Sequence, residues 1–321
     1  MLYLGSRTMS RILRHLEAIL EQGSVLAASR KLCISQPSLS QYVRRLEADY
    51  GITIFDRSVT PWALTEEGRH LIEAQKRIEA IDRECRQFFS DRKCLKTGEI
   101  CIASTAYRTA TLLNPVLAEF KRAYPGIMIR IEEGTTLEAA LMVESGRADC
   151  GIVISSMVLP SLDFIPIYRE RVLLGLPPSH PYAQAHPPAK DASEEADFKA
   201  LDGTTFISMK VGQVFHSYYE TLCSKFQIDL PLALETQSIL TVPMLISSGL
   251  GAALVPSTIA EDCRRRGVAL YSTGDILPVN EVSYVWLRGR YQSVAAKAFI
   301  AELRRHFLLH GEGETASKRE G

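Results

Sequence analysis

The sequence predicts an α/β protein with a small helical N-terminal part, one long connecting helix and a larger two-lobed part. Three observations predict this organisation. Two short helices joined by a turn lie near the N-terminus, a long helix with an apolar seam follows, and short apolar strands alternate with helices beyond about Glu99. At 321 residues, 46% of them hydrophobic, the chain is long enough for two or three compact units with substantial cores.

Three short helices are expected before Gly51. The first runs from Arg11 to Gln22 and ends at Gly23; its apolar face is formed by Ile12, Leu16, Ile19 and Leu20. The second runs from Val25 to Leu32, with an apolar side formed by Leu26, Ala27, Ala28 and Leu32. Ser35 is an N-cap for the third, which runs from about Gln36 to Asp49 and should bury Leu39, Tyr42 or Val43, and Leu46.

The opposite side of the third helix carries a polar stripe formed by Gln36, Ser38, Gln41 and Arg45. These side chains can hydrogen-bond to phosphates and base edges, and the stripe contains no carboxylate that would repel a polyanion. A short helix, a turn and a second helix with such a stripe suit the major groove of DNA. The alternative is an ordinary helical pair with a solvated polar face.

The run SQPSLSQYVRRLE, followed by Gly51, Phe55-Asp56-Arg57 and Leu64-Thr65-x-x-Gly68, strongly resembles the N-terminal winged helix-turn-helix of LysR-type transcriptional regulators. The resemblance spans about sixty residues without a gap, which is more specific than a short motif. It implies a sequence-specific regulator that binds promoter DNA. The DNA-binding residues would be Ser35, Gln36, Pro37, Ser38, Gln41, Arg44, Arg45 and Arg57, in a domain spanning 9–66.

One departure concerns the wing. Residues 58–63 read SVTPWA, where family members often carry Arg or Lys, so phosphate contact through the wing should be weaker or made by backbone N–H groups. Residues 1–8 look like an extension, because the usual family start resembles the segment that begins at Met9.

A long helix is expected after the wing, capped by Thr65 with Glu66 and Glu67 in its first turn. It carries a heptad-like seam formed by Leu71, Ala74, Ile78, Ile81, Cys85 and Phe88. Such a seam needs a partner helix; packing against its own domain is the alternative. The resemblance implies that this linker, residues 67–93, pairs two chains into a homodimer or homotetramer.

The remainder predicts a parallel, doubly wound sheet. Strands are expected at 100–103, 127–131, 150–154, 172–176, 205–207, 232–235, 252–255, 268–271 and 282–286; helices are expected at 112–124, 137–145, 214–226, 238–248 and 295–308. A polar loop is expected at 104–107. The arrangement resembles the two-lobed effector domain of the type 2 periplasmic-binding-protein kind. This domain would span 97–310, with lobe I at about 97–166 and 272–310 and lobe II at about 167–271.

Ligands of such sheets lie beyond the C-terminal strand ends, beside helix N-termini. Hydroxyl and amide side chains occupy those places, so we expect a small polar or anionic effector between the lobes, held by Ser104, Thr105, Thr135, Ser208, Gln213, Gln237 and Ser238. The alternative for each residue is that it only caps a helix. None of the seven is acidic, which disfavours a strongly cationic ligand, although Glu133 is adjacent.

Charge and motifs restrict the remaining classes. Residues 1–96 hold 16 Lys and Arg against 12 Asp and Glu, a net charge of +4, and the rest holds 21 against 25, a net charge of −4. No catalytic or nucleotide-binding motif is present, so we expect no enzyme, catalytic residue or cofactor. Seven scattered cysteines without a CxxC pair argue against disulfides and a metal site and fit the cytoplasm.

Two further alternatives remain open. A solute receptor would use the two lobes alone and would not need the first ninety residues. A redox-sensing regulator would need a reactive cysteine, for which Cys223 and Cys263 are the candidates. No apolar run approaches the ~20 residues of a membrane span. Expected partners are double-stranded promoter DNA and a small-molecule effector, with RNA polymerase as a further candidate.

Overall fold

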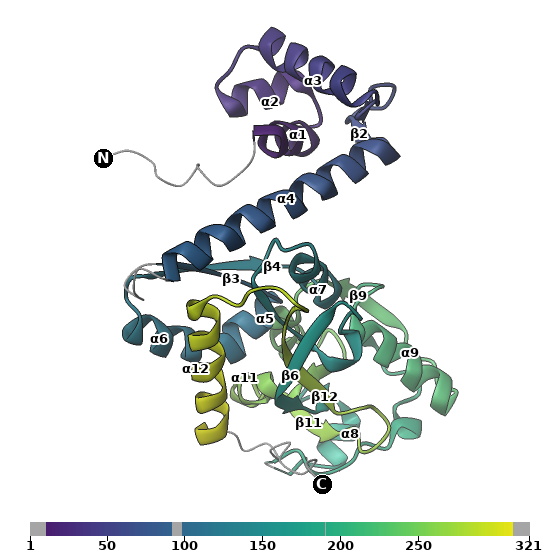
Figure 1. Ribbon diagram of the computed structural model, residues 1–321. Coiled ribbons are helices and arrows are strands. Elements are labelled where there is room, and N and C mark those ends of the chain that lie inside the picture. The colour runs from purple at the N-terminus through teal and green to yellow at the C-terminus, as the bar shows by residue number, and fades with distance from the viewer. Residues whose placement is uncertain (1–10, 92–97, 190, 311–321) are drawn as a thin grey trace. The chain divides into compact units, whose positions relative to one another are not determined.

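The computed structural model describes residues 11–91, 98–189 and 191–310 (Figure 1). Contacts between Cα atoms divide the chain into two compact units. The first holds the described residues of 1–94 with the short segment Glu144–Arg147, and the second holds those of 95–143 and 148–321. No helix in the described part of the chain is both long and apolar enough to cross a membrane.

The first unit is helical with a two-stranded wing. In chain order its elements are α1 (Arg11–Gln22), α2 (Val25–Leu32), α3 (Gln36–Tyr50), β1 (Phe55–Asp56), β2 (Ala63–Leu64) and α4 (Glu66–Asp91). The Ser24 hydroxyl caps α2 by accepting from the Ala27 N–H, and the Ser35 hydroxyl caps α3 by accepting from the Ser38 N–H. Both caps follow from the serine that precedes each helix, and the bounds predicted for the first two helices are confirmed.

One core joins α1, α2, α3 and the start of α4. Leu16, Ile19, Ala28 and Leu39 are fully buried in it, and Val43 rather than Tyr42 fills the middle position of α3. The prediction for Leu26 was wrong, because this residue is 54% exposed while Val25 is buried in its place. Gly68 is needed where α4 begins: a Cβ atom there would lie 2.1 Å from the Ile54 carbonyl oxygen.

The second unit begins with a five-stranded sheet in the order β4-β3-β5-β12-β6, which with its helices we call lobe I. Its strands are β3 (Gly98–Ser104), β4 (Ile127–Glu133), β5 (Cys150–Ile154), β6 (Leu162–Glu170) and β12 (Asn280–Leu287). β3 pairs in parallel with β4 and β5, whereas β12 runs antiparallel to both β5 and β6. The expectation of an all-parallel sheet was therefore wrong, because the last strand enters from the opposite end.

Helices cover both faces of the lobe I sheet. The helical elements are α5 (Ala106–Arg108), the π-helical turn η1 (Thr109–Leu113), α6 (Asn114–Ala123), α7 (Thr136–Glu144), η2 (Ser155–Met157) and α12 (Val294–His310). Ile100 and Ile102 of β3 pack with α6 and α12, while Cys101 and Ala103 pack with α7 on the other face. This alternation along one strand buries both sheet faces, so the strands are continuously apolar.

Residues 172–272 form a second lobe, which we call lobe II. Its strands are β7 (Val172–Leu176), β8 (Phe206–Met209), β9 (Leu232–Thr236), β10 (Ala253–Pro256) and β11 (Ala269–Ser272). Its helices are α8 (Pro181–Ala185), η3 (Phe198–Leu201), α9 (Val214–Phe226), η4 (Ile239–Thr241), α10 (Val242–Ser247), η5 (Ser257–Ile259) and α11 (Ala260–Arg265). β7 lies antiparallel between β10 and β11, and β8 pairs in parallel with β9.

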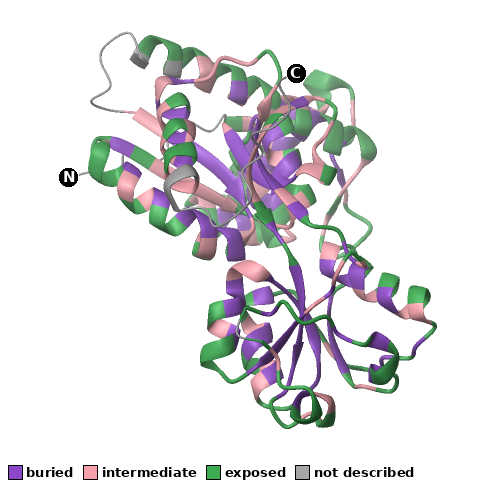
Figure 2. Cartoon of the chain, turned by 90° about the horizontal axis from the view of Figure 1, so that it is seen from below, coloured by how far each residue is buried: buried purple, intermediate pink, exposed green. Residues whose placement is uncertain are grey.

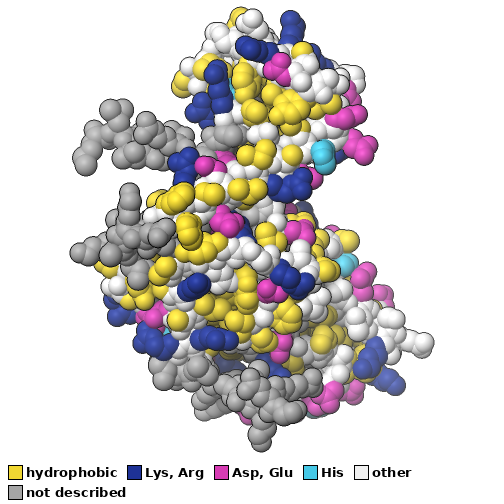
Figure 3. Space-filling view, viewed as in Figure 1, with side chains coloured by type: hydrophobic (Ala, Val, Ile, Leu, Met, Phe, Trp, Pro, Cys, Tyr) yellow, Lys and Arg dark blue, Asp and Glu magenta, His cyan; other side chains and the backbone are white. Residues whose placement is uncertain are grey.

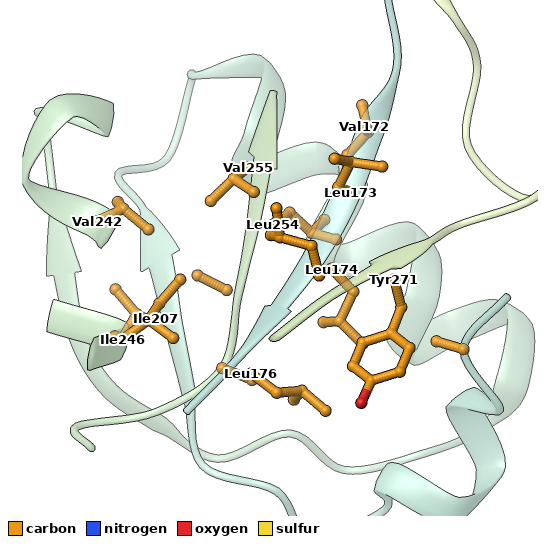
Figure 4. Packing of buried hydrophobic residues seen from close by; sticks show 14 of the residues in the cluster. Val172, Leu173, Leu174, Leu176, Ile207, Val242, Ile246, Leu254, Val255 and Tyr271 are labelled. Carbon is orange, nitrogen blue, oxygen red and sulfur yellow. The ribbon is translucent and has the colours of Figure 1, made fainter. Parts of the chain in front are cut away.

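The core of lobe II forms around β7. Side chains from β7, β10 and β11 meet Ile207 of β8 and Val242 and Ile246 of α10 (Figure 4). Buried residues gather in the strands of both sheets and on the inward faces of their helices (Figure 2). Because the side chains along the strands are buried in these cores, side chains that contact a ligand should lie at the strand ends and helix starts.

One local prediction in lobe I was wrong. The stretch 104–107 is not a loop, because β3 extends to Ser104 and the helix begins at Ala106, six residues before its predicted start at Leu112. Thr105 is its N-cap and accepts from the Arg108 N–H at 3.4 Å. This earlier start places Tyr107 and Arg108 on a helix directly after β3.

Candidate DNA-binding and effector-binding sites

The predicted DNA-contacting side chains of α3 are exposed together. Leu39, Val43 and Leu46 are buried, so the opposite side of the helix faces solvent. The exposed set consists of Ser35, Gln36, Pro37, Ser38, Gln41, Arg44 and Arg45. Dark blue side chains of Lys and Arg lie over the region of α2 and α3 in Figure 3. Asp49 lies 4.0 Å from Arg45 near the end of the helix, and both side chains remain mostly exposed.

A groove of about 370 Å³ lies beside the N-terminal half of α3. Its polar lining includes Gln36, Ser40, Arg44 and Arg57, and its walls include the exposed Leu26 and the ring of Trp62. Two guanidinium groups beside a helix N-terminus make this groove suitable for a phosphate of the DNA backbone. Leu26, predicted to be a core residue, is therefore part of the surface that surrounds the candidate DNA interface.

Arg57 is held at the base of the wing. Its guanidinium lies 2.5 Å from a Glu47 carboxylate oxygen and 5.4 Å from the ring centroid of Trp62. The other Glu47 oxygen accepts from the Ile54 N–H at 3.0 Å. Glu47 thus fixes both Arg57 and the chain that leads into the wing, a positioning role that the α3 stripe alone does not reveal.

The seam of α4 is divided between two environments. Leu71 is buried in the helical core of the first unit, so for this residue the alternative, packing within its own domain, is confirmed. Ile78 and Ile81 are 56% and 61% exposed, and Cys85 and Phe88 are also exposed. In Figure 3 yellow hydrophobic side chains lie along the path that α4 takes in Figure 1. An exposed apolar row at heptad spacing is typical of a helix that pairs with another helix.

Lobe I brings three of the predicted effector residues to one edge of its sheet. Ser104 ends β3 opposite Glu133 of β4 and is fully buried. Thr105 caps α5, and Thr135 precedes α7. The Thr135 hydroxyl accepts from the Glu138 N–H at 3.2 Å, and Glu138 in turn accepts from the Thr135 N–H at 2.7 Å, which is a capping box.

Lobe II holds the other four predicted residues at the ends of β8 and β9. The Gln213 amide donates to the Gln237 carbonyl oxygen at 3.4 Å, and Gln237 and Ser238 are exposed. Ser208 is buried, and its hydroxyl lies 3.0 Å from the Met209 carbonyl oxygen and 3.1 Å from His216 Nδ1. The Ser208 hydroxyl is therefore engaged within the lobe, whereas Gln213, Gln237 and Ser238 surround the start of α9 and η4.

Sequence reasoning missed a buried polar cluster where the lobes meet. The Tyr107 hydroxyl donates to Glu170 at 2.8 Å, and the Thr258 hydroxyl donates to the other oxygen of Glu170 at 2.6 Å. Tyr218 of α9 donates to Asn280. Burial raises the pKa of Tyr107 well above the ordinary value, so this hydroxyl remains a donor. The only sequence signal was a tyrosine and an arginine directly after a strand end.

The two candidate cysteines, Cys223 and Cys263, give no support to a redox site. Burial raises the pKa of Cys263 to about 12, and burial also raises the pKa of Cys223. A reactive thiol needs a lowered pKa and access to solvent. His180 accepts from the Tyr182 N–H at 3.2 Å and caps α8, so its ring has a structural role. Within residues 11–91, 98–189 and 191–310, no three His, Cys, Asp or Glu side chains gather as metal ligands would.

Comparisons with known proteins agree with this architecture. A family model described as the LysR substrate binding domain matches residues 95–308, and one described as the bacterial regulatory helix-turn-helix protein, lysR family, matches residues 10–69. A probable RuBisCO transcriptional regulator of Synechocystis sp. is 28% identical over 305 residues, which are 93% of this chain and 86% of that protein.

Solved structures share the fold. Full-length CbnR in complex with its target DNA aligns with a TM-score of 0.65 at 20% identity, over 92% of this chain and 98% of that one. A C206 mutant of OxyR from Corynebacterium glutamicum aligns with a TM-score of 0.55 at 25% identity, over 92% and 91% of the two chains. With a helix-turn-helix model and an effector-domain model that together match most of its length, the chain belongs to the LysR family of transcriptional regulators.

Proposed function

We propose that this regulator binds its operator through α3, with Gln36, Ser38, Gln41 and Arg45 directed at base edges. Ser35, Pro37, Arg44 and Arg57 would lie at the phosphates. The observation that supports this proposal most directly is the burial pattern of the capped helix α3. Its apolar side is fully buried, and its exposed side bears no carboxylate before Asp49. The groove lined by Arg44 and Arg57 supports a phosphate position beside the helix N-terminus.

Paired substitutions in α3 test this assignment. Gln41→Ala should cost about 1–3 kcal/mol of operator binding and relax the preference at one base pair, whereas Arg44→Ala should weaken binding evenly across sequences and reduce the salt dependence. A binding-site selection with both variants and wild type distinguishes the two effects. If Gln41→Ala keeps both affinity and base preference, Gln41 is not a base contact.

The exposed part of the α4 seam supports pairing of two chains, which would present two recognition helices to a pseudo-palindromic operator. We place the regulator in the cytoplasm, together with promoter DNA and RNA polymerase. A homodimer or homotetramer is the assembly that we expect in solution.

We further propose that a small polar or anionic effector binds in the second unit, between the two lobes. Thr105 and Thr135 at helix starts, together with Gln213, Gln237 and Ser238 in lobe II, are placed where backbone N–H groups point outward. Because Thr105 and Thr135 also cap helices, capping alone remains the competing explanation for these two residues. Effector binding would change how the lobes meet and thereby the spacing of the recognition helices.

Isothermal titration with a panel of small carboxylates, on wild type and on Ser104→Ala and Gln213→Ala, tests the effector site. The Gln213 variant should lose affinity while its operator binding without effector stays unchanged. Ser104, predicted from the sequence, is fully buried at the end of β3, and full affinity with full transcriptional response in Ser104→Ala would show that it is not part of the site.

A further inference from the structure

Arg108 is a buried cation without a matching anion. Its side chain is 1% exposed, and its Nε has no hydrogen-bond partner. Its Nη1 donates to the Thr136 hydroxyl at 3.3 Å, and its guanidinium carbon lies 4.9 Å from the centroid of the Tyr107 ring. In the described part of the chain, no carboxylate oxygen lies within 4.0 Å of this guanidinium.

Among the described residues, Glu170 is a candidate for the counter-charge; it is fully buried and lies beside Tyr107. Its two oxygens already accept hydrogen bonds from the hydroxyls of Tyr107 and Thr258. The Tyr107 side chain therefore lies between Glu170 and Arg108, and the two charged groups make no direct contact. A guanidinium has five N–H donors and stays charged, and burying such a group is costly unless it is paired. The described neighbours of the Arg108 guanidinium are the Thr136 hydroxyl and the ring and hydroxyl of Tyr107, and neither residue carries a negative charge there.

Arg108 also points at the positive end of a helix. Thr136 is the first residue of α7, which is nine residues long. The capping box uses the N–H groups of Thr135 and Glu138, and the N–H groups of Thr136 and Leu137 have no intrahelical acceptor. The helix dipole and the guanidinium therefore favour negative charge at the same place. The guanidinium and the first turn of α7 are thus two independent features that favour negative charge at one position, beside the capping carboxylate of Glu138.

We propose that Arg108 and the first turn of α7 form an anion subsite, which takes an oxyanion group of the effector, a carboxylate or a phosphate. The proposal rests on the effector site proposed above and deepens it, because it assigns a charge to the ligand and adds a residue outside the predicted set. Carboxylates and phosphates accept N–H bonds from an arginine fork, and the Nε–H of Arg108 is a donor without a partner.

Two acids oppose this assignment and define the competing explanation. Glu138 occupies part of the α7 start through the capping box, and Glu170 lies beyond Tyr107. If Arg108 served only as a distant counter-charge to Glu170, it would support folding and would not respond to added anions.

The full-length protein can be tested with three simple probes: sodium sulfate, sodium phosphate and disodium succinate, each compared with sodium chloride at equal ionic strength. Thermal unfolding of the wild type should shift upward with these oxyanions, because a ligand that binds only the folded state stabilises it. In Arg108→Met the shift should vanish, and titration should give affinity weaker by about tenfold or more. Arg122→Gln, an exposed arginine of α6, is the matched control and should behave as wild type.

The proposal is overturned if the wild type gains no more from the oxyanions than from chloride, or if Arg108→Met keeps the full shift. Should Arg108→Met fail to fold, Arg108→Lys decides, because it keeps the charge and loses the fork: unchanged affinity overturns the proposal, and weakened affinity supports it. A response to sulfate and phosphate but not to succinate assigns a phosphate group, and the reverse assigns a carboxylate.

Two further measurements separate this inference from its alternatives. Under the counter-charge explanation, adding Glu170→Gln to Arg108→Met should restore the stability that Arg108→Met loses. The wild type should then show no response to the added anions. A chain that binds its operator but shows no anion response refutes the subsite and leaves the regulator function standing. A chain that binds anions through Arg108 but binds no promoter DNA refutes the proposed function and leaves the subsite standing.

Discussion

The Tyr107 hydroxyl donates a hydrogen bond of 2.8 Å to the fully buried carboxylate of Glu170. Tyr107 belongs to the helix that follows β3, and Glu170 is the last residue of β6, separated by Arg171 from β7, the first strand of lobe II. Thr258 of lobe II donates to the same carboxylate. The contact therefore ties the start of a lobe I helix to the segment where the chain crosses into lobe II.

Removal of the Tyr107 hydroxyl should destabilise the second unit. Tyr107→Phe leaves a buried carboxylate short of one donor, so the free energy of unfolding should fall by about 1–3 kcal/mol. Urea unfolding followed by circular dichroism measures the change. Tyr124→Phe, in a half-buried tyrosine whose hydroxyl makes no described hydrogen bond, should stay within about 0.5 kcal/mol of wild type. Equal losses in the two variants would show that the Glu170 contact contributes nothing specific.

Glu47 should matter for DNA binding although it does not face the DNA in our assignment. Glu47→Gln keeps the size of the side chain but weakens its bonds to Arg57 and to the Ile54 N–H, so the wing loses its fixed position. Operator affinity should fall by roughly 1 kcal/mol, since hydrogen bonds to charged groups contribute about that much or more. Fluorescence anisotropy with labelled operator measures it, and Glu67→Gln, an exposed acid of α4, is the control.

The two halves of the α4 seam should respond differently to a buried charge. Leu71→Asp should unfold the first unit, because Leu71 lies in its core. Ile78→Asp should leave the helical content of each chain intact and convert the assembly to monomers with weakened operator binding. Sedimentation and circular dichroism together distinguish these results, with Ile78→Leu as the conservative control. A dimeric Ile78→Asp protein with normal DNA binding would exclude this part of the seam as the chain contact.

Stability of the first unit should decline in mild acid because of His15. Burial lowers the pKa of His15 below its ordinary value of 6.5, and its ring packs 4.7 Å from the ring of Tyr42. The unfolded chain therefore takes up a proton more readily than the folded one, so this contribution to stability is present above about pH 6.5 and is lost as the pH falls below it.

The measurement can be confined to the first unit. In a Trp286→Phe background, fluorescence during urea unfolding reports on Trp62 alone. His15→Phe keeps a ring beside Tyr42 and should remove part of the acid dependence, whereas His70→Gln, at an exposed site, should leave it unchanged. An acid dependence identical in wild type and His15→Phe would contradict the assignment.

Local patterns were sufficient for many of the elements, although not for β6 or the helix start at Ala106, and for the exposed polar stripe of α3. The bounds of α1, α2, β5, β7 and α9 follow from periodicity, caps and glycines, because these signals lie within a few residues of each other. The exposure of Gln41 and Arg45 follows from the burial of Leu39 and Val43 on the other side of the helix. Their contacts with DNA remain a prediction.

Contacts between segments that lie far apart in the sequence could not be predicted from local patterns. The antiparallel direction of β12 depends on where the chain returns from lobe II, which no local pattern encodes. The burial of Arg108 depends on α7, whose first residue is 28 positions further along the chain. Charged residues are rarely buried unless they are paired, so a sequence reading places such a residue on the surface.

The position of β12 in the sheet has a consequence for biosynthesis. This strand lies between β5 and β6, yet it is separated from β5 by more than a hundred residues, as the pairing of Val282 with Ile154 shows. Lobe II is continuous from β7 to β11, so it can complete its core while the rest of the chain is still on the ribosome. Until β12 has been synthesised through Leu287, the edge of β5 that pairs with it would remain unpaired. During that interval this exposed strand edge would be the site at which we expect a chaperone to bind.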